Sequence, residues 1–321
     1  MVGSRSNTLL LWVILGVCPA YAGEASQPLE MRAASPALRR LPATALRIAD
    51  RRSSGRRSGQ MTSAGLRVRQ YLDEGFRQIS RRAAPAARES FLAALREVAV
   101  ARVNAKVAPS ATQSLADSLL AMREMRDFYA PGSRVQLDPY VMAVAHQTPV
   151  LKGTVETGVA SQQAIDRYSA YATGQLVAAC GKEPLAAEAL YGLGKIASRA
   201  ALTQVADSRA AQLAKIFFSA SLRVNPRHAV VGNELGVILA RGGSWERALL
   251  VLRQSATYAP SQAIWHNLAV VHQYRGEREL ATLAQGEVWR LSRNAEVTPH
   301  PQQFSLLDAQ RPGAVARAAA P

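Results

Sequence analysis

Residues 226–260 read PRHAVVGNELGVILARGGSWERALLVLRQSATYAP, and this stretch decides the fold because its pattern returns along the chain. Two apolar runs of helical spacing are separated by Gly242-Gly243 and are bounded by Pro226 and Pro260, which lie 34 positions apart. Glycine permits a tight turn and proline punctuates helix ends. The stretch therefore predicts two helices joined by a short turn.

The same pattern occurs three times between Ala187 and Arg293. The matching residues are Leu193, Gly194, Ala214, Phe218 and Pro226 in the first unit, Leu235, Gly236, Leu239, Ala248, Leu252 and Pro260 in the second, and Trp265, Leu268, Ala269, Gly276 and Ala281 in the third. The two halves of the first unit stand about eight residues too far apart. We therefore expect a lengthened first helix or a loop around Ser198 to Asp207.

At these residues the chain resembles the tetratricopeptide repeat (TPR) family, whose units are helix-turn-helix pairs of 34 residues. In that family small residues let the two helices of a unit approach closely, and large apolar residues fill the space between them. The second unit matches best, and Gly232, where the family has a bulky residue, is its departure. The third unit departs at Gln285 and Val288. The resemblance implies an all-α fold, a TPR-like solenoid of helical hairpins.

The rest of the chain predicts additional N-terminal helices and a disordered basic linker before the repeats. Apolar residues recur at three- and four-residue steps from Ser63 onward, which is typical of amphipathic helices. The predicted organisation is a signal peptide at 1–22, a disordered Arg-, Ala- and Pro-rich linker at 23–62, amphipathic helices at 63–129, a long loop at 130–160, TPR-like repeats at 161–293 and a flexible tail at 294–321.

The first 22 residues have the features of an export signal. Arg5 precedes an apolar run at Leu9–Val17, and Ala20-Tyr21-Ala22 supplies the small residues that a signal peptidase reads. We expect cleavage near Ala22 and a periplasmic or secreted protein. Cys180 is then the single thiol left, so no internal disulfide forms. We expect it to be a small buried apolar residue, with a reactive thiol as the alternative.

Positive charge is concentrated ahead of the repeats. The formal net charge is +16, and residues 23–110 hold 17 Lys and Arg against 7 Asp and Glu, whereas residues 183–293 hold 13 against 8. One interpretation is an electrostatic arm for an anionic cell-envelope surface, and the other is a solvated linker. The export signal argues against nucleic acid as the partner.

The TPR resemblance also implies a working surface, because the first helices of successive units line a groove that holds a peptide or a partner helix. The residues implied to line it are Tyr191, Lys195, Arg199, Asn233, Arg241, His266, Asn267 and Tyr274. Asparagine amides in this row hydrogen-bond a peptide backbone, and Arg or Lys pairs with carboxylates. The alternative is that these are ordinary exposed polar residues.

No pattern of catalysis or cofactor binding stands out. The five histidines lack metal-ligand spacing, and the chain has no phosphate loop, dinucleotide fingerprint or nucleophile elbow, so we expect no metal, no cofactor and no enzyme. Asp138, Tyr140 and His146 in the long loop form the enzymatic alternative, although capping and packing are the expected roles of Asp138 and His146.

These features predict an exported scaffold or adaptor that binds another protein or peptide without catalysis. The alternative is a structural protein that its basic N-terminal arm holds to an anionic polymer or lipid of the cell envelope.

Overall fold

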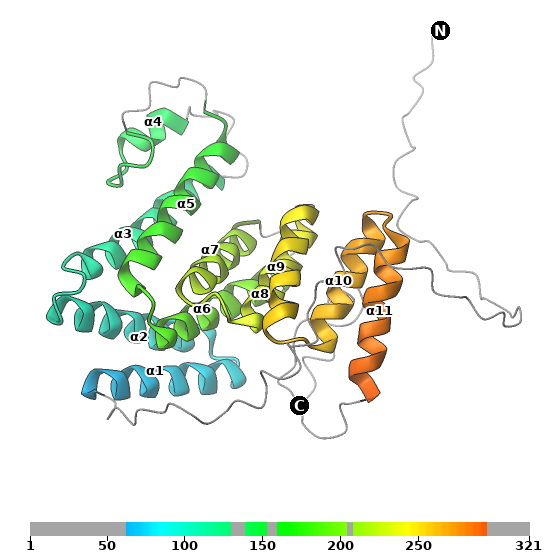
Figure 1. Ribbon diagram of the computed structural model, residues 1–321. Helices are drawn as coiled ribbons and strands as arrows, with labels where there is room; N and C mark the ends of the chain where they lie inside the picture. Colours follow the sequence, from blue (N-terminus) through cyan, green and yellow to red (C-terminus); the bar gives the residue numbers. More distant parts are fainter. Residues whose placement is uncertain (1–61, 130–138, 153–158, 204–207, 294–321) are drawn as a thin grey trace, which may run out of the picture. The chain divides into compact units, whose positions relative to one another are not determined.

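The computed structural model describes residues 62–129, 139–152, 159–203 and 208–293, all of which belong to one compact unit. The regular structure of these residues is entirely helical, so the chain is an all-α protein (Figure 1). The elements are α1 (Ser63–Ser80), α2 (Ala84–Asn104), α3 (Ala111–Glu124), the 3-10 helix η2 (Met125–Tyr129), α4 (Pro139–Val144), α5 (Ser161–Cys180), α6 (Pro184–Thr203), α7 (Ser208–Val224), α8 (Ala229–Arg241), α9 (Trp245–Tyr258), α10 (Gln262–Tyr274) and α11 (Arg278–Arg293).

Several predictions fall outside the described residues. They are the signal peptide at 1–22, all of the linker except Thr62, the tail at 294–321 and Asp138 in the long loop.

Helical hairpins are the building unit of the described part. The helices pair as α1 with α2, α3 with α5, α6 with α7, α8 with α9, and α10 with α11. The last three pairs lie where the sequence repeats, and α8 and α10 begin at Ala229 and Gln262. The chain therefore has a helical-repeat fold. The sequence predicted helices at 63–129 but not that α1 and α2 form one hairpin and that α3 pairs with α5.

The first repeat is stretched because both of its helices are longer than those of the second, and α7 has 17 residues whereas α9 has 14. Helix α6 has 20 residues, whereas α8 has 13, and α6 continues to Thr203. Pro184 is its first residue, a place where proline's missing N–H costs nothing. The extra spacing predicted between the halves of this unit is thus accounted for by additional helical turns.

Two hydrophobic clusters run through the structure, and the α6–α7 hairpin contributes to both. Leu190 and Ile216 belong to the cluster that α1, α2, α3 and α5 build. Ala197 and Phe218 belong to the cluster shared with α8, α9, α10 and α11. Helices α1 and α2 both pack on α6, and α5 packs on α7. The N-terminal helices therefore pack against the repeats rather than forming a separate module.

Phe91 shows how closely the N-terminal helices approach the repeats. Its ring is fully buried and lies between Gly75 of α1 and Gly192 of α6. A Cβ atom at Gly75 would lie 2.6 Å from Cε1 of the ring, and one at Gly192 would overlap it as well. Three helices meet at this position because two of them present no side chain there.

Small residues also allow the close approach of the two helices in the first and second repeats. A Cβ atom at Gly236 would lie 2.5 Å from Cγ of Leu252, and one at Gly194 would overlap the ring of Phe218. The departure at Gly232 has a local reason, since a side chain there would overlap the hydroxyl of Ser255. That hydroxyl donates to the Val251 carbonyl at 2.8 Å.

The helix ends agree with the sequence signals in most places. The Ser261 hydroxyl accepts from the Ile264 N–H at 3.3 Å, as an N-cap should. Ser244 occupies the corresponding place before α9, but its side chain makes no such bond. Gly243 and Gly276, both at φ 75°, make the turns between helices, and Gly181 has φ 64° after α5. These positive φ values are where glycine is needed.

The predicted loop at 130–160 is not loop throughout, because it contains α4. The helix is six residues long and begins at Pro139. Proline is well suited to a first helical position, so a single turn of helix starts there without cost.

Candidate partner-binding surface

The eight residues predicted to bind a partner lie on the first helices of the three repeats. Tyr191, Lys195 and Arg199 are on α6, Asn233 and Arg241 on α8, and His266, Asn267 and Tyr274 on α10. Arg199, Arg241 and Tyr274 are exposed, and Tyr191, Lys195 and His266 are half-buried. Asn233 and Asn267 are fully buried. The structure thus divides the predicted row into exposed, half-buried and buried members.

The two asparagines contact each other. Asn267 Nδ2 donates to Asn233 Oδ1 at 2.8 Å, and both side chains have 0% exposure. They were predicted to face a bound peptide, but their amides lie in the contact between α8 and α10. The reason is the repeat itself, since residues 34 positions apart occupy equivalent places on neighbouring first helices. These two residues therefore join the repeats.

Lys195 already has a carboxylate partner within the chain. Its Nζ lies 3.0 Å from Oε1 of Glu234, and the Glu234 side chain is 2% exposed whereas that of Lys195 is 26% exposed. A carboxylate buried so deeply needs a cation, and α6 supplies it to α8. Glu234 was not among the residues predicted for this surface, although it stands next to the predicted residue Asn233 on α8. The exposed cations of the row are Arg199 and Arg241.

Tyr191 packs within an aromatic group instead of projecting from the surface. Its ring centroid lies 5.5 Å from that of His228, 6.2 Å from that of Phe218 and 6.3 Å from that of Phe76. Burial raises the pKa of its phenol, and the negative charges of Glu234 and Glu188 add to this. The phenol is therefore neutral, and the residue links α1, α6 and α7.

Tyr274 is the most exposed aromatic residue of the predicted row. It is 59% exposed, and its ring stacks on Trp245 with a centroid distance of 5.2 Å and an interplanar angle of 12°. Trp245 is the first residue of α9, so the pair connects the second and third repeats. Stacking fixes the exposed phenol ring in one orientation, which lowers the entropy cost of using it for binding.

Beside this aromatic pair, a network of ion pairs joins α9 to the turn between α10 and α11. Arg275 contacts Glu246, at the start of α9, and its Nε lies 2.9 Å from Glu277 Oε1. His272 Nδ1 lies 2.5 Å from Glu277 Oε2. The contacts with His272 and Arg275 lower the pKa of Glu277. The network therefore helps to fix the edge of the surface where Tyr274 lies.

A second polar group surrounds His146, at the site of the enzymatic alternative. His146 Nδ1 lies 2.6 Å from the Tyr168 hydroxyl, and its Nε2 lies 3.1 Å from Asp127 Oδ2. Glu124 accepts from the Gln147 N–H at 2.5 Å and from the Thr148 hydroxyl. Burial raises the pKa of Tyr168 to about 12. His146 is itself buried, so these contacts hold residues 146–148 against α3 and α5, the packing role expected for His146.

The thiol of Cys180 is buried at the end of α5. Burial raises its pKa to about 12, and the nearby Arg102 offsets only part of this effect. Since thiolate is the reactive form, the thiol has the character of a small apolar core residue. Within the described ranges, no three His, Cys, Asp or Glu side chains come together so as to hold a metal ion. None of the described helices is both long and apolar enough to span a membrane.

The comparisons with known proteins give one structural similarity to report. No protein-family model matches the chain, and no curated protein matches it. Among solved structures, the chain is similar to the crystal structure of MamA protein, with 14% sequence identity and a TM-score of 0.33. That similarity covers 74% of this chain and 100% of the other.

Proposed function

We propose that this chain is a scaffold of the tetratricopeptide repeat type that binds a segment of another protein on α6, α8 and α10. The observation that carries the proposal is the 34-residue correspondence between first helices, at which Asn267 meets Asn233. Helices in such a row present equivalent positions side by side, and an extended peptide or a helix can contact several of them at once. The partner is a protein or peptide, and the scaffold performs no catalysis.

The exposed members of the row specify what the partner segment should carry. Arg199 and Arg241 are exposed cations on neighbouring first helices, and Tyr274 adds a fixed aromatic ring on the next one. Arginine binds carboxylates in a bidentate manner. A segment with acidic residues and an apolar side chain therefore fits this surface better than a basic one.

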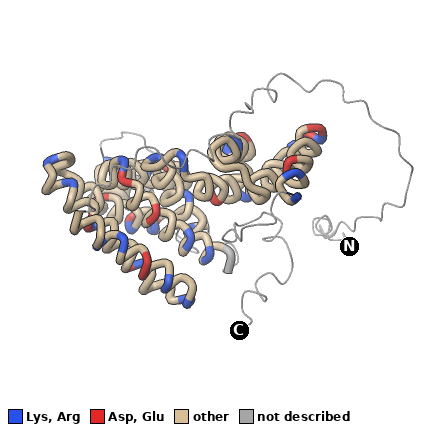
Figure 2. Tube along the Cα trace, turned by 60° about the horizontal axis from the view of Figure 1, so that its bottom comes forward, with Lys and Arg blue, Asp and Glu red and all other residues tan. Residues whose placement is uncertain are grey.

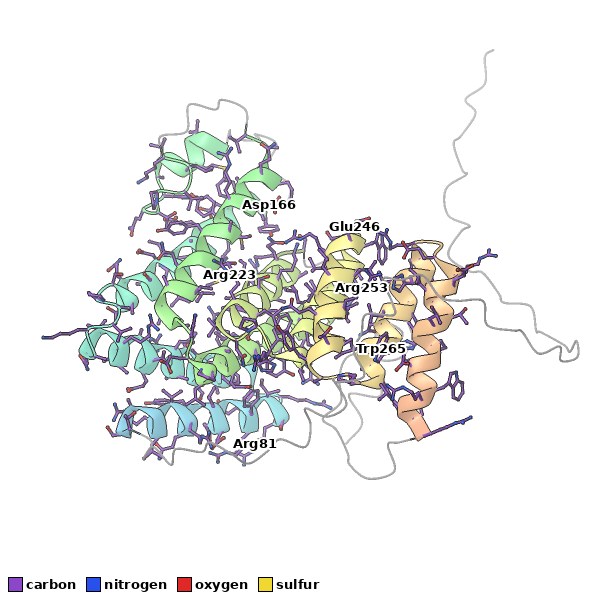
Figure 3. The ribbon with its side chains drawn as sticks, viewed as in Figure 1. Arg81, Asp166, Arg223, Glu246, Arg253 and Trp265 are labelled. Carbon is purple, nitrogen blue, oxygen red and sulfur yellow. The ribbon has the colours of Figure 1, made fainter. Side chains whose placement is uncertain are left out.

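Site-specific crosslinking in the native compartment tests this assignment. A photoreactive amino acid at Arg199 or Arg241 should crosslink to a defined protein. The same substitution at Arg253, which is also an exposed arginine but lies on the second helix α9, should not (Figure 3). The charge-reversing Arg199→Glu and Arg241→Glu variants should lose the partner, whereas Arg253→Glu retains it. Equal crosslinking from all three positions would refute a surface made of first helices.

We further propose that the protein works outside the cytoplasm, supported by the Arg5, Leu9–Val17 and Ala20–Ala22 pattern. Mass spectrometry of the protein purified from its native host should find a chain that begins at Gly23. A chain that retains residues 1–22 would contradict cleavage near Ala22.

A second candidate function is attachment to an anionic envelope surface by the basic N-terminal arm. It is supported by the 17 Lys and Arg against 7 Asp and Glu at residues 23–110. Of these, 8 Lys and Arg and 3 Asp and Glu lie at residues 23–61. The others lie at residues 62–110, within and beside α1 and α2, and the described helices carry both signs of charge (Figure 2). Binding to vesicles that contain anionic lipid should weaken steeply with salt and should be lost on deleting residues 23–61. Binding that survives this deletion would exclude the arm as the attachment site.

A further inference from the structure

The α1–α2 hairpin carries more positive than negative charge. Residues 62–110 hold 9 Lys and Arg against 4 Asp and Glu. Arg69 and Arg96 are exposed, and neither takes part in an ion pair with the described residues. The hairpin therefore presents positive charge that its own helices do not neutralise.

One ion pair fixes the register of the two helices. Arg67 Nη2 lies 2.9 Å from Glu97 Oε2, and the helices run antiparallel because a short turn joins them. Leu66, next to Arg67, and Val100, about one turn after Glu97, therefore lie at a similar level of the hairpin. They are 51% and 45% exposed. Two apolar side chains thus project into solvent beside this ion pair.

The two arginines without an ion-pair partner stand on the same sides of their helices as these apolar residues. Arg69 is three residues after Leu66, and Arg96 is four residues before Val100, so each pair shares one helix face. We name Leu66, Arg69, Arg96 and Val100 the outer face of the hairpin. Its two exposed apolar side chains are each next to a cation.

The outer face lies near the end of the hairpin where α1 begins and α2 ends. Lys106 and Val107 follow α2 there, and Val107 is 68% exposed. Arg81 marks the opposite end of α1, which is nearer to the repeats (Figure 3). The outer face is therefore separate from the surface proposed for a protein partner on α6, α8 and α10.

An anionic bilayer matches this composition better than an acidic protein or polymer does. Lipid phosphates attract exposed Lys and Arg, and apolar side chains enter the boundary between headgroups and acyl chains. An anionic polymer would neutralise the cations but would leave Leu66 and Val100 in water. The chain that leads into α1 has the same sign of charge, with 8 Lys and Arg against 3 Asp and Glu at residues 23–61.

We propose that the outer face docks on a bilayer that contains anionic lipid, with Leu66 and Val100 inserted among the headgroups and Arg69 and Arg96 paired with lipid phosphates. This inference rests on the second candidate function, attachment by the basic N-terminal arm, and adds a contact from the folded part of the chain. Stable binding to a membrane surface generally takes two signals. The arm and the outer face therefore act together, and neither holds the protein alone.

Sedimentation of the protein with vesicles of phosphatidylglycerol and phosphatidylcholine tests the apolar half of the proposal. The Leu66→Gln/Val100→Gln variant should bind several-fold more weakly than the unmodified protein. The matched control is Leu250→Gln/Val144→Gln, which replaces a leucine and a valine that are 68% and 65% exposed on α9 and α4. This control should bind as the unmodified protein does.

The same vesicles test the cations. Arg69→Gln/Arg96→Gln should weaken binding by roughly fivefold for each arginine, the effect of one cation close to an anionic bilayer. Arg223→Gln/Arg253→Gln removes the same charge from exposed positions on α7 and α9 and should have a much smaller effect. Since all the replaced side chains are exposed, the melting temperatures of the four variants should match that of the unmodified protein.

Three outcomes would overturn the proposal, and they are distinguishable. If the unmodified protein does not bind the vesicles, envelope attachment fails together with this inference. If it binds and the outer-face variants bind as well as their controls, the arm remains the attachment site and the outer face is excluded. If the arginine variant loses binding to polyglutamate and to vesicles alike while Leu66→Gln/Val100→Gln binds normally, the outer face recognises an acidic polymer or protein instead of a bilayer.

Discussion

Asn267 donates a hydrogen bond to Asn233 at 2.8 Å, and the two residues are 34 positions apart in the sequence and fully buried. Equivalent positions of successive repeats thus touch each other. The contribution of this contact between repeats to the free energy of unfolding can be measured.

The effects of replacing the two members of this pair should not be additive. Asn233→Leu or Asn267→Leu removes one side of this buried amide–amide hydrogen bond and should destabilise the fold by about 1–3 kcal/mol. The double variant removes both polar groups and should be less destabilised than the sum of the single variants. Urea denaturation of all four chains gives the coupling energy, and strict additivity would show that the two amides do not depend on each other.

Lys195→Met should destabilise the protein because it leaves the Glu234 carboxylate buried without a cation. We expect a loss of roughly 1–3 kcal/mol in the free energy of unfolding. Lys195→Arg keeps the charge and should lose less, and Lys195→Met/Glu234→Leu should recover much of the stability. Denaturant titration measures this, and a double variant no better than Lys195→Met would contradict the explanation.

Alanine should destabilise the protein at a glycine that contacts Phe91 and should stabilise it at a helical glycine with open space around it. Gly192→Ala places a methyl group in the Phe91 ring and should cost about 1–3 kcal/mol. At Gly174 and Gly286 a Cβ meets nothing within 4 Å, so alanine there should stabilise by about 0.5–1 kcal/mol through helix propensity. Thermal unfolding should therefore rank these variants on opposite sides of the unmodified chain.

Gly243 and Gly242 provide a second matched comparison, within one turn. Gly243 has φ 75°, whereas Gly242 has φ −85°, which any residue adopts. Gly243→Ala should cost about 1 kcal/mol through backbone strain, and Gly243→Val should cost more because its side chain is β-branched. Gly242→Ala should be nearly neutral. Similar melting temperatures for the two alanine variants would show that this turn tolerates a side chain at either position.

Glu277 should make stability depend on acid. Its hydrogen bonds with His272 and Arg275 hold its pKa below the ordinary value of 4.5. A carboxylate with a lowered folded-state pKa stabilises the fold above pH 4.5, and this contribution is lost as the pH falls through the folded-state value. The melting temperature of Glu277→Gln should therefore vary less between pH 5 and pH 3 than that of the unmodified chain. If the melting temperatures of the two proteins changed equally with pH, Glu277 would not contribute to the acid sensitivity.

Local sequence signals predicted the repeats well because their physical causes are local. Helix starts at Pro184, Ala229 and Gln262 follow from proline, spacing and capping, and the turns at Gly243 and Gly276 follow from the need for positive φ. The lengthened first unit was also visible as an interval between matched residues.

Contacts between distant helices were not predictable in the same way. Nothing near Phe91 in the sequence indicates that Gly75 and Gly192 receive its ring. The burial of Asn233 and Asn267, and the pairing of Glu234 with Lys195, depend on how neighbouring first helices are placed. These contacts depend on tertiary structure. The family resemblance therefore indicated which residues lie on the first helices, but not which of them are in contact.

The α6–α7 hairpin has a consequence for how the protein unfolds. Linear repeat arrays can lose their ends one unit at a time, because each unit depends only on its neighbours. Here one hairpin supplies residues such as Leu190 and Phe218 to both hydrophobic clusters. Unfolding of that hairpin exposes part of each cluster, so it destabilises the helices on both sides of it. The terminal helices can unfold separately, but unfolding of the α6–α7 hairpin should unfold both halves together.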